Sequence, residues 1–215
     1  MSPRWKTLLS LIVPVKQMED KLMEFAQVSN IAEICCCHLY KFSYSQLKEA
    51  GACDAIHLAS INGIGELFKM LMRPPNMIHF IDDEFGRGLL QNAIIHRQER
   101  IFDILCQRGL NNQVTGHVDE NDNNVLHCAG FWEPSPQLDK VYGATLQMQR
   151  EIQWYQEVEK MDPQKYKQMK NKDGLKPKAL FTKEHEDLLK QGSAWVKDTS
   201  QACMLVATLI ATVMF

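Results

Sequence analysis

The side chains with the clearest chemical potential are a run of three cysteines followed by a histidine, Cys35-Cys36-Cys37-His38. Thiolate and imidazole are ligands that zinc prefers, but zinc sites typically space them by about two to four residues so that the chelate can close. Three adjacent cysteines on a helix point in three directions and cannot all reach one metal ion. The sequence therefore predicts no metal site here, and the run is interpreted as buried apolar thiols or as a palmitoylated patch.

Two further histidines, His57 and His127, are the other titratable candidates. Each occupies the same slot of a segment that recurs along the chain, and such a histidine is more often bonded to nearby backbone than catalytic. The sequence contains no Ser-His-Asp arrangement, phosphate-binding loop or kinase signature. Gly63-Ile64-Gly65 is a glycine-rich fragment without a preceding strand. We therefore expect no catalytic residue, no cofactor and no small-molecule substrate.

The composition limits the class of protein further. The 215 residues suit one domain or one compact array with a tail, and 45% of them are hydrophobic, which is enough for a core. Lys and Arg number 24 against 26 Asp and Glu, a net charge of −2, so the chain as a whole has no attraction to nucleic acid. Seven cysteines with a triple run do not resemble a disulfide framework and favour a reducing compartment.

Three segments share one pattern, a turn followed by a short apolar helix, and they begin at Asp54, Asp83 and Asp119. Each carries an alanine at the equivalent place, and these alanines are separated by 34 and 36 residues: Ala59, Ala93 and Ala129. Ankyrin repeats have a period of about 33 residues. The sequence therefore predicts an all-α fold, an ankyrin-repeat solenoid of about three to four degenerate repeats with a C-terminal apolar helix.

The pattern has a physical basis within each repeat. In the segment 83–86 the aspartate bonds its own backbone and Gly86 supplies the positive φ of a tight turn. The small alanine lets neighbouring helices approach, and Gly63 ends the first helix of its repeat. Leu67 and Leu71 form the apolar face of the second helix and complete the stack.

A fourth, weaker unit and an insertion follow the three clear repeats. The segment 171–174 predicts another turn, followed by a helix that Thr182 caps and Gly192 ends. Between the third and fourth units, residues 144–161 predict a long helix. Its apolar face is expected to hold four residues, with Trp154 beside them: Leu146, Ile152, Tyr155 and Val158. Upstream of the repeats, residues 18–39 also predict a helix.

The end of the chain, residues 202–215, reads ACMLVATLIATVMF and carries no charge. As a helix it would rise about 21 Å, against a bilayer hydrocarbon core of about 30 Å. A buried core helix is one interpretation, but the apolar run is still continuing at Phe215, which favours a transmembrane helix cut short in a fragment. Ten lysines against six acidic residues between positions 160 and 200 favour a cytosolic location for the preceding repeats.

Four runs of residues resemble those of one known family: LQMQREIQW (146–154), KNKDG (170–174), LFTKEH (180–185), and Lys197-Asp198-Thr199 followed by CMLVATLIAT (203–212). The family is the plant ankyrin-repeat membrane proteins with a C-terminal PGG domain, of the accelerated-cell-death type. The resemblance implies a cytosolic ankyrin array, then transmembrane helices, and a role in plant defence, cell-death or stress signalling. The Pro-Gly-Gly run is absent because the sequence stops at Phe215, so the chain is expected to be truncated within the first transmembrane helix.

These expectations divide the chain into three parts: an N-terminal segment (1–50), degenerate repeats (51–192) with an insert helix (144–161), and the start of a membrane region (193–215). The predicted function is a protein–protein interaction module tethered to a plasma membrane or endomembrane. Five residues at predicted turns and helix ends are the candidate partner-binding positions: Asp83, Glu84, Arg97, Gln98 and Arg100. Two alternatives remain, a regulatory part of a multi-helix transporter or channel, and a soluble truncated decoy.

Overall fold

The computed structural model describes residues 30, 33–34, 44–72, 83, 85–108, 116–133, 143–161, 164 and 166–214. The helices within this part are α2 (Tyr44–Glu49), α3 (Ala52–Ile61), α4 (Gly65–Leu71), α5 (Leu89–Ile95), α6 (Glu99–Gln107), α8 (Val125–Gly130), α9 (Ala144–Met161), α10 (Pro177–Glu184) and α11 (Glu186–Met214), with a 3-10 helix η2 (Tyr166–Gln168). No strand occurs among the described residues, so the predicted all-α class is confirmed. The cysteine run at positions 35–37 and most of the segment 18–39 lie outside them.

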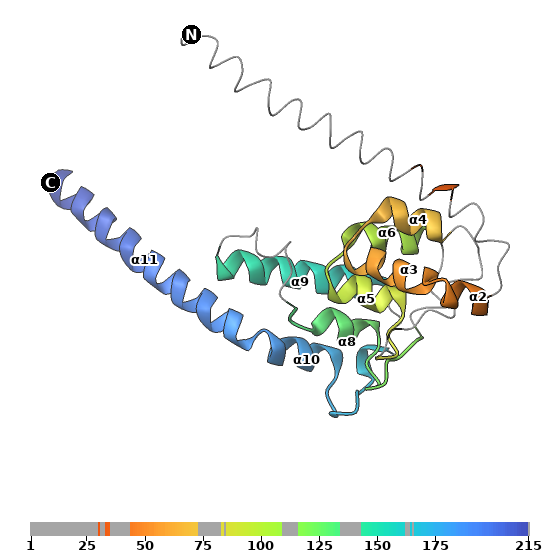
Figure 1. Ribbon diagram of the computed structural model, residues 1–215. Helices are drawn as coiled ribbons and strands as arrows, with labels where there is room; N and C mark the ends of the chain where they lie inside the picture. Colours follow the sequence, from red (N-terminus) through yellow and green to blue (C-terminus); the bar gives the residue numbers. More distant parts are fainter. Residues whose placement is uncertain are drawn as a thin grey trace, which may run out of the picture.

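The helices form helix–turn–helix pairs, and the pairs follow one another in a row (Figure 1). The first helices pack in chain order, α3 on α5, α5 on α8, and α8 on α10. Among the second helices of the pairs, α4 packs on α6. The long helix α9 packs on α8 and on α11. Each pair thus buries its apolar face against its neighbours, as stacked repeats do.

The same five-residue turn precedes α5, α8 and α10. In each turn the N–H of the first residue donates to the carbonyl of the fifth at 3.0 Å, and the turns are Asp83 to Arg87, Asp119 to Asn123, and Asn171 to Leu175. The fourth residue adopts the left-handed conformation, at φ 68° in Gly86, 59° in Asp122 and 75° in Gly174. The turn predicted from Asp83 and Gly86 is therefore confirmed, and Asp122 shows that aspartate fills the glycine place in the next unit.

In α5 and α8 the side chain of the third helical residue links one turn to the next. His127 accepts a hydrogen bond at Nδ1 from the Asn124 N–H (3.2 Å), and its Nε2 lies 3.0 Å from the Leu175 carbonyl in the following turn. Gln91 does the same one unit earlier, where Oε1 accepts from the Gly88 N–H (2.9 Å) and Nε2 donates to the Asn123 carbonyl (3.0 Å). The structural role predicted for His127 is confirmed.

The core runs through the row of helices rather than around one centre. The three alanines of the repeated pattern are fully buried, at 0% exposure: Ala59, Ala93 and Ala129. They lie among larger buried side chains of the same helices, such as Ile56, Ile94 and Leu126. Small side chains at these places let the first helices approach closely, which is the reason for their recurrence in the sequence.

Helix α9 has the bounds predicted for the insert helix, Ala144–Met161, but its buried face differs. Its buried residues are Glu151, Trp154 and Val158, whereas Leu146 and Ile152 are 55% and 39% exposed. The predicted face was right for Val158, which is fully buried, and wrong for Leu146 and Ile152, because the prediction assumed apolar residues alone. A buried carboxylate belongs to the true face, and its charge is compensated inside the molecule.

The helix end predicted at Gly192 is also wrong, because α11 continues through it to Met214. Gly192 is buried against Thr145 at the start of α9, so its small size serves helix–helix contact and does not terminate the helix. From Ser193 onward every described residue of α11 is exposed, and the helix extends away from the other elements (Figure 1). Within the described part of the chain, no helix combines the length and the apolar character needed to cross a membrane.

Candidate functional site

The turn between α5 and α6 places one charged residue inside the molecule. Arg97 adopts a left-handed conformation (φ 56°) and is only 6% exposed. Its Nε and Nη2 donate to the two carboxylate oxygens of Glu151 on α9, at 3.0 and 2.5 Å. Nη1 donates to the carbonyls of Ile94 (2.9 Å) and Ile95 (2.8 Å), and Nη2 also to that of Phe131 (2.6 Å). All five N–H groups of the guanidinium therefore have acceptors.

Glu151 receives a third hydrogen bond from His185, which lies between α10 and α11. The Nε2 atom of His185 is 2.9 Å from Glu151 Oε2, and its Nδ1 is 2.8 Å from the Phe181 carbonyl. Each ring nitrogen of His185 therefore lies within hydrogen-bond distance of an oxygen acceptor. The imidazole also stacks on the Phe181 ring at 4.0 Å between centroids. We refer to Arg97, Glu151 and His185 as the charge cluster.

The carboxyl of Glu151 is ionised despite its burial. Removal from water by itself would raise its pKa, but hydrogen bonds from His185 and Arg97 outweigh that effect and hold the pKa of Glu151 below its ordinary value. One carboxylate thus joins the α5–α6 turn, the long helix α9 and the α10–α11 junction. The charge cluster fixes the orientation of these elements relative to one another.

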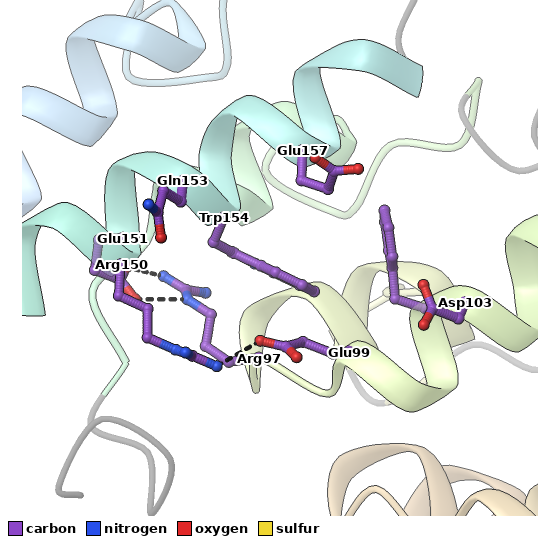
Figure 2. Close-up of a pocket in the computed structure, with 9 residues that line it drawn as sticks. Arg97, Glu99, Asp103, Arg150, Glu151, Gln153, Trp154 and Glu157 are labelled. Carbon is purple, nitrogen blue, oxygen red and sulfur yellow. Dashed lines mark hydrogen bonds and ion pairs between the residues drawn. The ribbon is translucent and has the colours of Figure 1, made fainter. Parts of the chain in front are cut away.

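Next to the charge cluster a cleft of about 270 Å³ opens between α6 and α9 (Figure 2). We call it the α6–α9 cleft. Arg97 and Glu151 close one end of it, and the remaining lining comes from the two facing helices: Glu99, Phe102 and Asp103 on α6, and Arg150, Gln153, Trp154 and Glu157 on α9. Figure 2 shows the Trp154 side chain reaching across the cleft from α9, with Glu157 and Glu99 to either side of it.

An aromatic pair forms the interior of the cleft. The Phe102 and Trp154 rings lie 5.2 Å apart with a tilt of 56°, and both side chains are largely buried. The Trp154 indole N–H donates to the Ile94 carbonyl at 3.1 Å, so the polar edge of the ring is already bonded. A tilted pair at this distance contributes about 0.5–1.5 kcal/mol beyond the burial of its area.

The cleft is more acidic than basic, with four carboxylates and two guanidinium groups. Arg97 and Glu151 neutralise each other in the charge cluster, and Arg150 bonds Glu99 across the opening at 2.6 Å. Glu157 bonds Lys160, one turn further along α9, at 2.5 Å, and both of these side chains are exposed. Asp103 forms no ion pair within the described part of the chain, so the α6 wall presents an uncompensated carboxylate.

The arrangement is suited to binding and offers little for covalent chemistry. Cys106, near the cleft on α6, is a poor nucleophile because burial, and then the nearby Asp103, raise the pKa of its thiol to about 11. Among the described residues no group of histidine, cysteine and carboxylate side chains is placed to hold a metal ion. What the cleft offers is shape, aromatic surface and negative charge.

Of the five residues predicted to bind a partner, the four that the structure describes have different surroundings. Asp83 accepts hydrogen bonds from the N–H groups of Phe85 and Arg87 and shapes the turn before α5, and Glu84 lies outside the described residues. Gln98 reaches the Ile61 carbonyl in the preceding unit, and Arg100 pairs with Glu66 of that unit at the surface. Arg97 is buried and holds Glu151, so its guanidinium is not presented to solvent as the sequence suggested.

Three residues of this site were not predicted as functional from the sequence: Glu151, His185 and the cleft residue Trp154. One signal was available, because Glu151 and Trp154 are three residues apart and Val158 follows four later, a spacing that places all three on one helix face. A lone glutamate on an otherwise apolar stripe indicates an internal cation. No pattern in the sequence identifies Arg97 as that cation, because it lies 54 residues away.

The exposed end of α11 is the second notable surface. Its large apolar side chains are exposed around the helix, from 56% to 87%: Met204, Leu205, Val206, Leu209, Ile210, Val213 and Met214. The hydroxyls of Thr208 and Thr212 donate to backbone carbonyls one turn back, at 2.8 and 2.9 Å, and so are satisfied within the helix. Comparison with protein-family models and with curated proteins gives no match to this chain.

Proposed function

We infer that the chain is an ankyrin-type protein–protein interaction module, tethered to a membrane by the apolar end of α11. It performs no chemistry on a substrate and acts by bringing a protein partner to the membrane surface. A role in signalling, as in plant defence or stress responses, follows from the resemblance of its sequence to that family of ankyrin-repeat membrane proteins.

The repeated turns support the ankyrin part of the proposal. Three turns of the same hydrogen-bonded form precede helices that pack in a row, and each turn is bonded to the next. The Glu120 N–H donates to the Phe85 carbonyl at 3.2 Å, and the Lys172 N–H donates to the Asn121 carbonyl at 3.0 Å. A ladder of turns joined in this way creates an extended surface, which repeat proteins use for partners.

The exposed half of α11 is the observation that carries the tether. A soluble surface rarely exposes such a continuous apolar area, and areas of this kind mark interfaces with proteins or membranes. The helix end is apolar on every side, because Thr208 and Thr212 bond their own backbone. A protein groove would need only one apolar face, whereas lipid contacts the whole circumference of a helix. Lipid is therefore the proposed environment, with the lysine-bearing repeats on the cytosolic side.

Flotation with phosphatidylcholine vesicles tests the tether. The full chain is expected to rise with the vesicles in a density gradient, and the double variant Leu209→Lys/Ile210→Lys to remain at the bottom, because charge within hydrocarbon is costly. The matched control, Gln191→Lys/Ser193→Lys, places the same charges on exposed positions of the same helix nearer its packed end. Flotation of both variants alike, or failure of the full chain to float, would exclude the tether.

A further inference from the structure

We propose that the α6–α9 cleft binds an arginine side chain on a segment of the protein partner. The inference rests on the proposed function, because it identifies the chemistry by which the module recognises that partner. It also predicts where the partner lies, against the insert helix α9 and not along the turns.

The size of the cleft favours a single anchoring side chain. Its volume of about 270 Å³ lies near the lower end of the ~300–1,000 Å³ of pockets that enclose a small ligand. Protein interfaces, by contrast, commonly depend on a few large side chains inserted into such openings, and arginine is among the most frequent. The cleft is therefore large enough for one side chain of an extended segment.

The charges of the cleft select a cation. Asp103 on α6 and Glu157 on α9 face the opening from opposite walls, and the Asp103 carboxylate has no cationic partner among the described residues. Glu157 forms an exposed ion pair with Lys160. Such a pair contributes little free energy, so an arginine of the partner can replace Lys160 at small cost in free energy. An anionic ligand, including an acidic lipid headgroup, would meet both carboxylates and be repelled.

The aromatic pair favours arginine over lysine. The planar guanidinium stacks on aromatic rings and can bond two carboxylates at once, whereas the lysine ammonium is a compact and strongly hydrated charge. Phe102 and Trp154 line the cleft but are only 5% and 8% exposed, so they offer the aliphatic part of an arginine a small apolar contact. The charge cluster is fully bonded and closes the far end, so the guanidinium would stop between Asp103 and Glu157.

The test uses the full chain, labelled with ¹⁵N, in nanodiscs of phosphatidylcholine. The probe is a blocked Gly/Ser peptide with one central arginine, and its control is the same peptide with neutral citrulline. The arginine peptide is expected to shift the backbone amide signals of Asp103 and Glu157 and the indole signal of Trp154 saturably, and the citrulline peptide to leave them in place. Equal effects of the two peptides, or no saturable shift at millimolar peptide, would overturn the proposal.

Variants distinguish the cleft from other acidic surfaces. Asp103→Asn/Glu157→Gln keeps the shape of the cleft, removes both charges and is expected to weaken binding about fivefold, since two partly exposed pairs are lost. The control, Glu49→Gln/Asp54→Asn, removes two exposed carboxylates on α2 and α3 and should bind as the parent does. Equal weakening in both variants would show non-specific attraction and overturn the proposal.

Flotation of the same variants separates the two proposals. The cleft variant is expected to float with vesicles as the parent does, because its changes are remote from the end of α11. Peptide binding without flotation would leave the cleft assigned and exclude the tether. Flotation without peptide binding would support the tether and exclude the proposed role of the cleft.

Discussion

Arg97 shows how one residue can combine strain and stabilisation. An L-residue in the left-handed region costs about 1–2 kcal/mol, and a buried guanidinium is costly to remove from water. Arg97 offsets both costs with five hydrogen bonds, two of them to Glu151 on α9. The charge cluster is thus fully satisfied and highly sensitive to the loss of any member.

Glu151→Gln is expected to destabilise the protein by about 3–5 kcal/mol, because it leaves the buried Arg97 without a counter-charge. The matched variant Glu99→Gln removes one partner of the exposed Arg150 pair and should cost less than about 1 kcal/mol. Urea unfolding followed by circular dichroism measures both. Similar midpoints for the two variants would show that the charge cluster contributes no more than a surface pair.

His127 makes stability depend on pH in a defined direction. Burial lowers its pKa below the ordinary value of 6.5 more than its bond to the Leu175 carbonyl raises it, so the folded state holds the ring neutral. A lowered pKa means that the stabilising effect is complete above about pH 6.5 and declines as the pH falls toward the folded pKa. The lowered pKa of Glu151 also makes the protein less stable as the pH falls, but only below about pH 4.5, the ordinary pKa of a glutamate.

The free energy of unfolding of the parent chain is therefore expected to fall between pH 7.5 and pH 5.5. His127→Gln should flatten this slope at little cost in stability at pH 7.5, because Gln91 already makes both bonds in the equivalent position of the preceding unit. Urea midpoints across the pH range supply the measurement. His96 also has a pKa lowered by burial and retains part of the slope. An unchanged slope in the variant would exclude His127 as a source of the pH dependence.

At the scale of the elements, two glycines lie at close helix contacts, and they differ in whether the contact leaves room for an added Cβ atom. A Cβ on Gly130, at the end of α8, would lie 3.2 Å from the Phe181 N atom and 3.3 Å from the Pro177 carbonyl oxygen, both of them backbone. A Cβ on Gly192 in α11 would meet Thr145 at 3.5 Å or more, which is ordinary contact. The α8–α10 contact is thus the tighter of the two.

Gly130→Ala is expected to cost about 1–3 kcal/mol, because α8 and α10 would have to separate. Gly192→Ala should be neutral or stabilise by up to about 1 kcal/mol, because alanine is the better helix former inside α11. Thermal unfolding of the two single variants measures the difference. If Gly130→Ala is tolerated as well as Gly192→Ala, the third and fourth helix pairs are not packed as closely as described.

At the scale of the whole molecule, α11 joins two different environments. Its first part packs through Leu188 and Gly192, while residues 193–214 are exposed along the entire helix. The stability of the helix row should therefore be independent of the apolar end, because stacked units stabilise one another mainly through neighbouring contacts.

A chain that ends at Ser200 is expected to unfold at the same urea midpoint as the full chain, within about 0.5 kcal/mol, since the residues removed are exposed. The control variant Leu188→Ala removes a side chain that is 7% exposed and should cost about 2 kcal/mol or more. Loss of stability on shortening the chain would show that the end of α11 packs against the rest of the protein.

Local patterns in the sequence were sufficient for part of this description. The turn chemistry of Asp83 and Gly86 and the bounds of α9 follow from interactions among residues close in sequence, and the buried alanines were identified by their recurrence along the chain. The role of His127 followed from its recurrence in a periodic slot. Periodicity reports the local environment of a residue, and in repeat proteins much of that environment is local.

The charge cluster and the α6–α9 cleft were decided by tertiary structure alone. Arg97 and Glu151 are 54 positions apart, and Glu151 and His185 are 34 apart, so no local pattern shows that they meet. A buried charge breaks the apolar periodicity from which helix faces are predicted, and this is why the prediction for α9 missed Glu151 and wrongly included Leu146 and Ile152. Gly192 was misinterpreted for a related reason, since a glycine that ends a helix and one that admits a neighbouring helix look the same until the neighbour is in place.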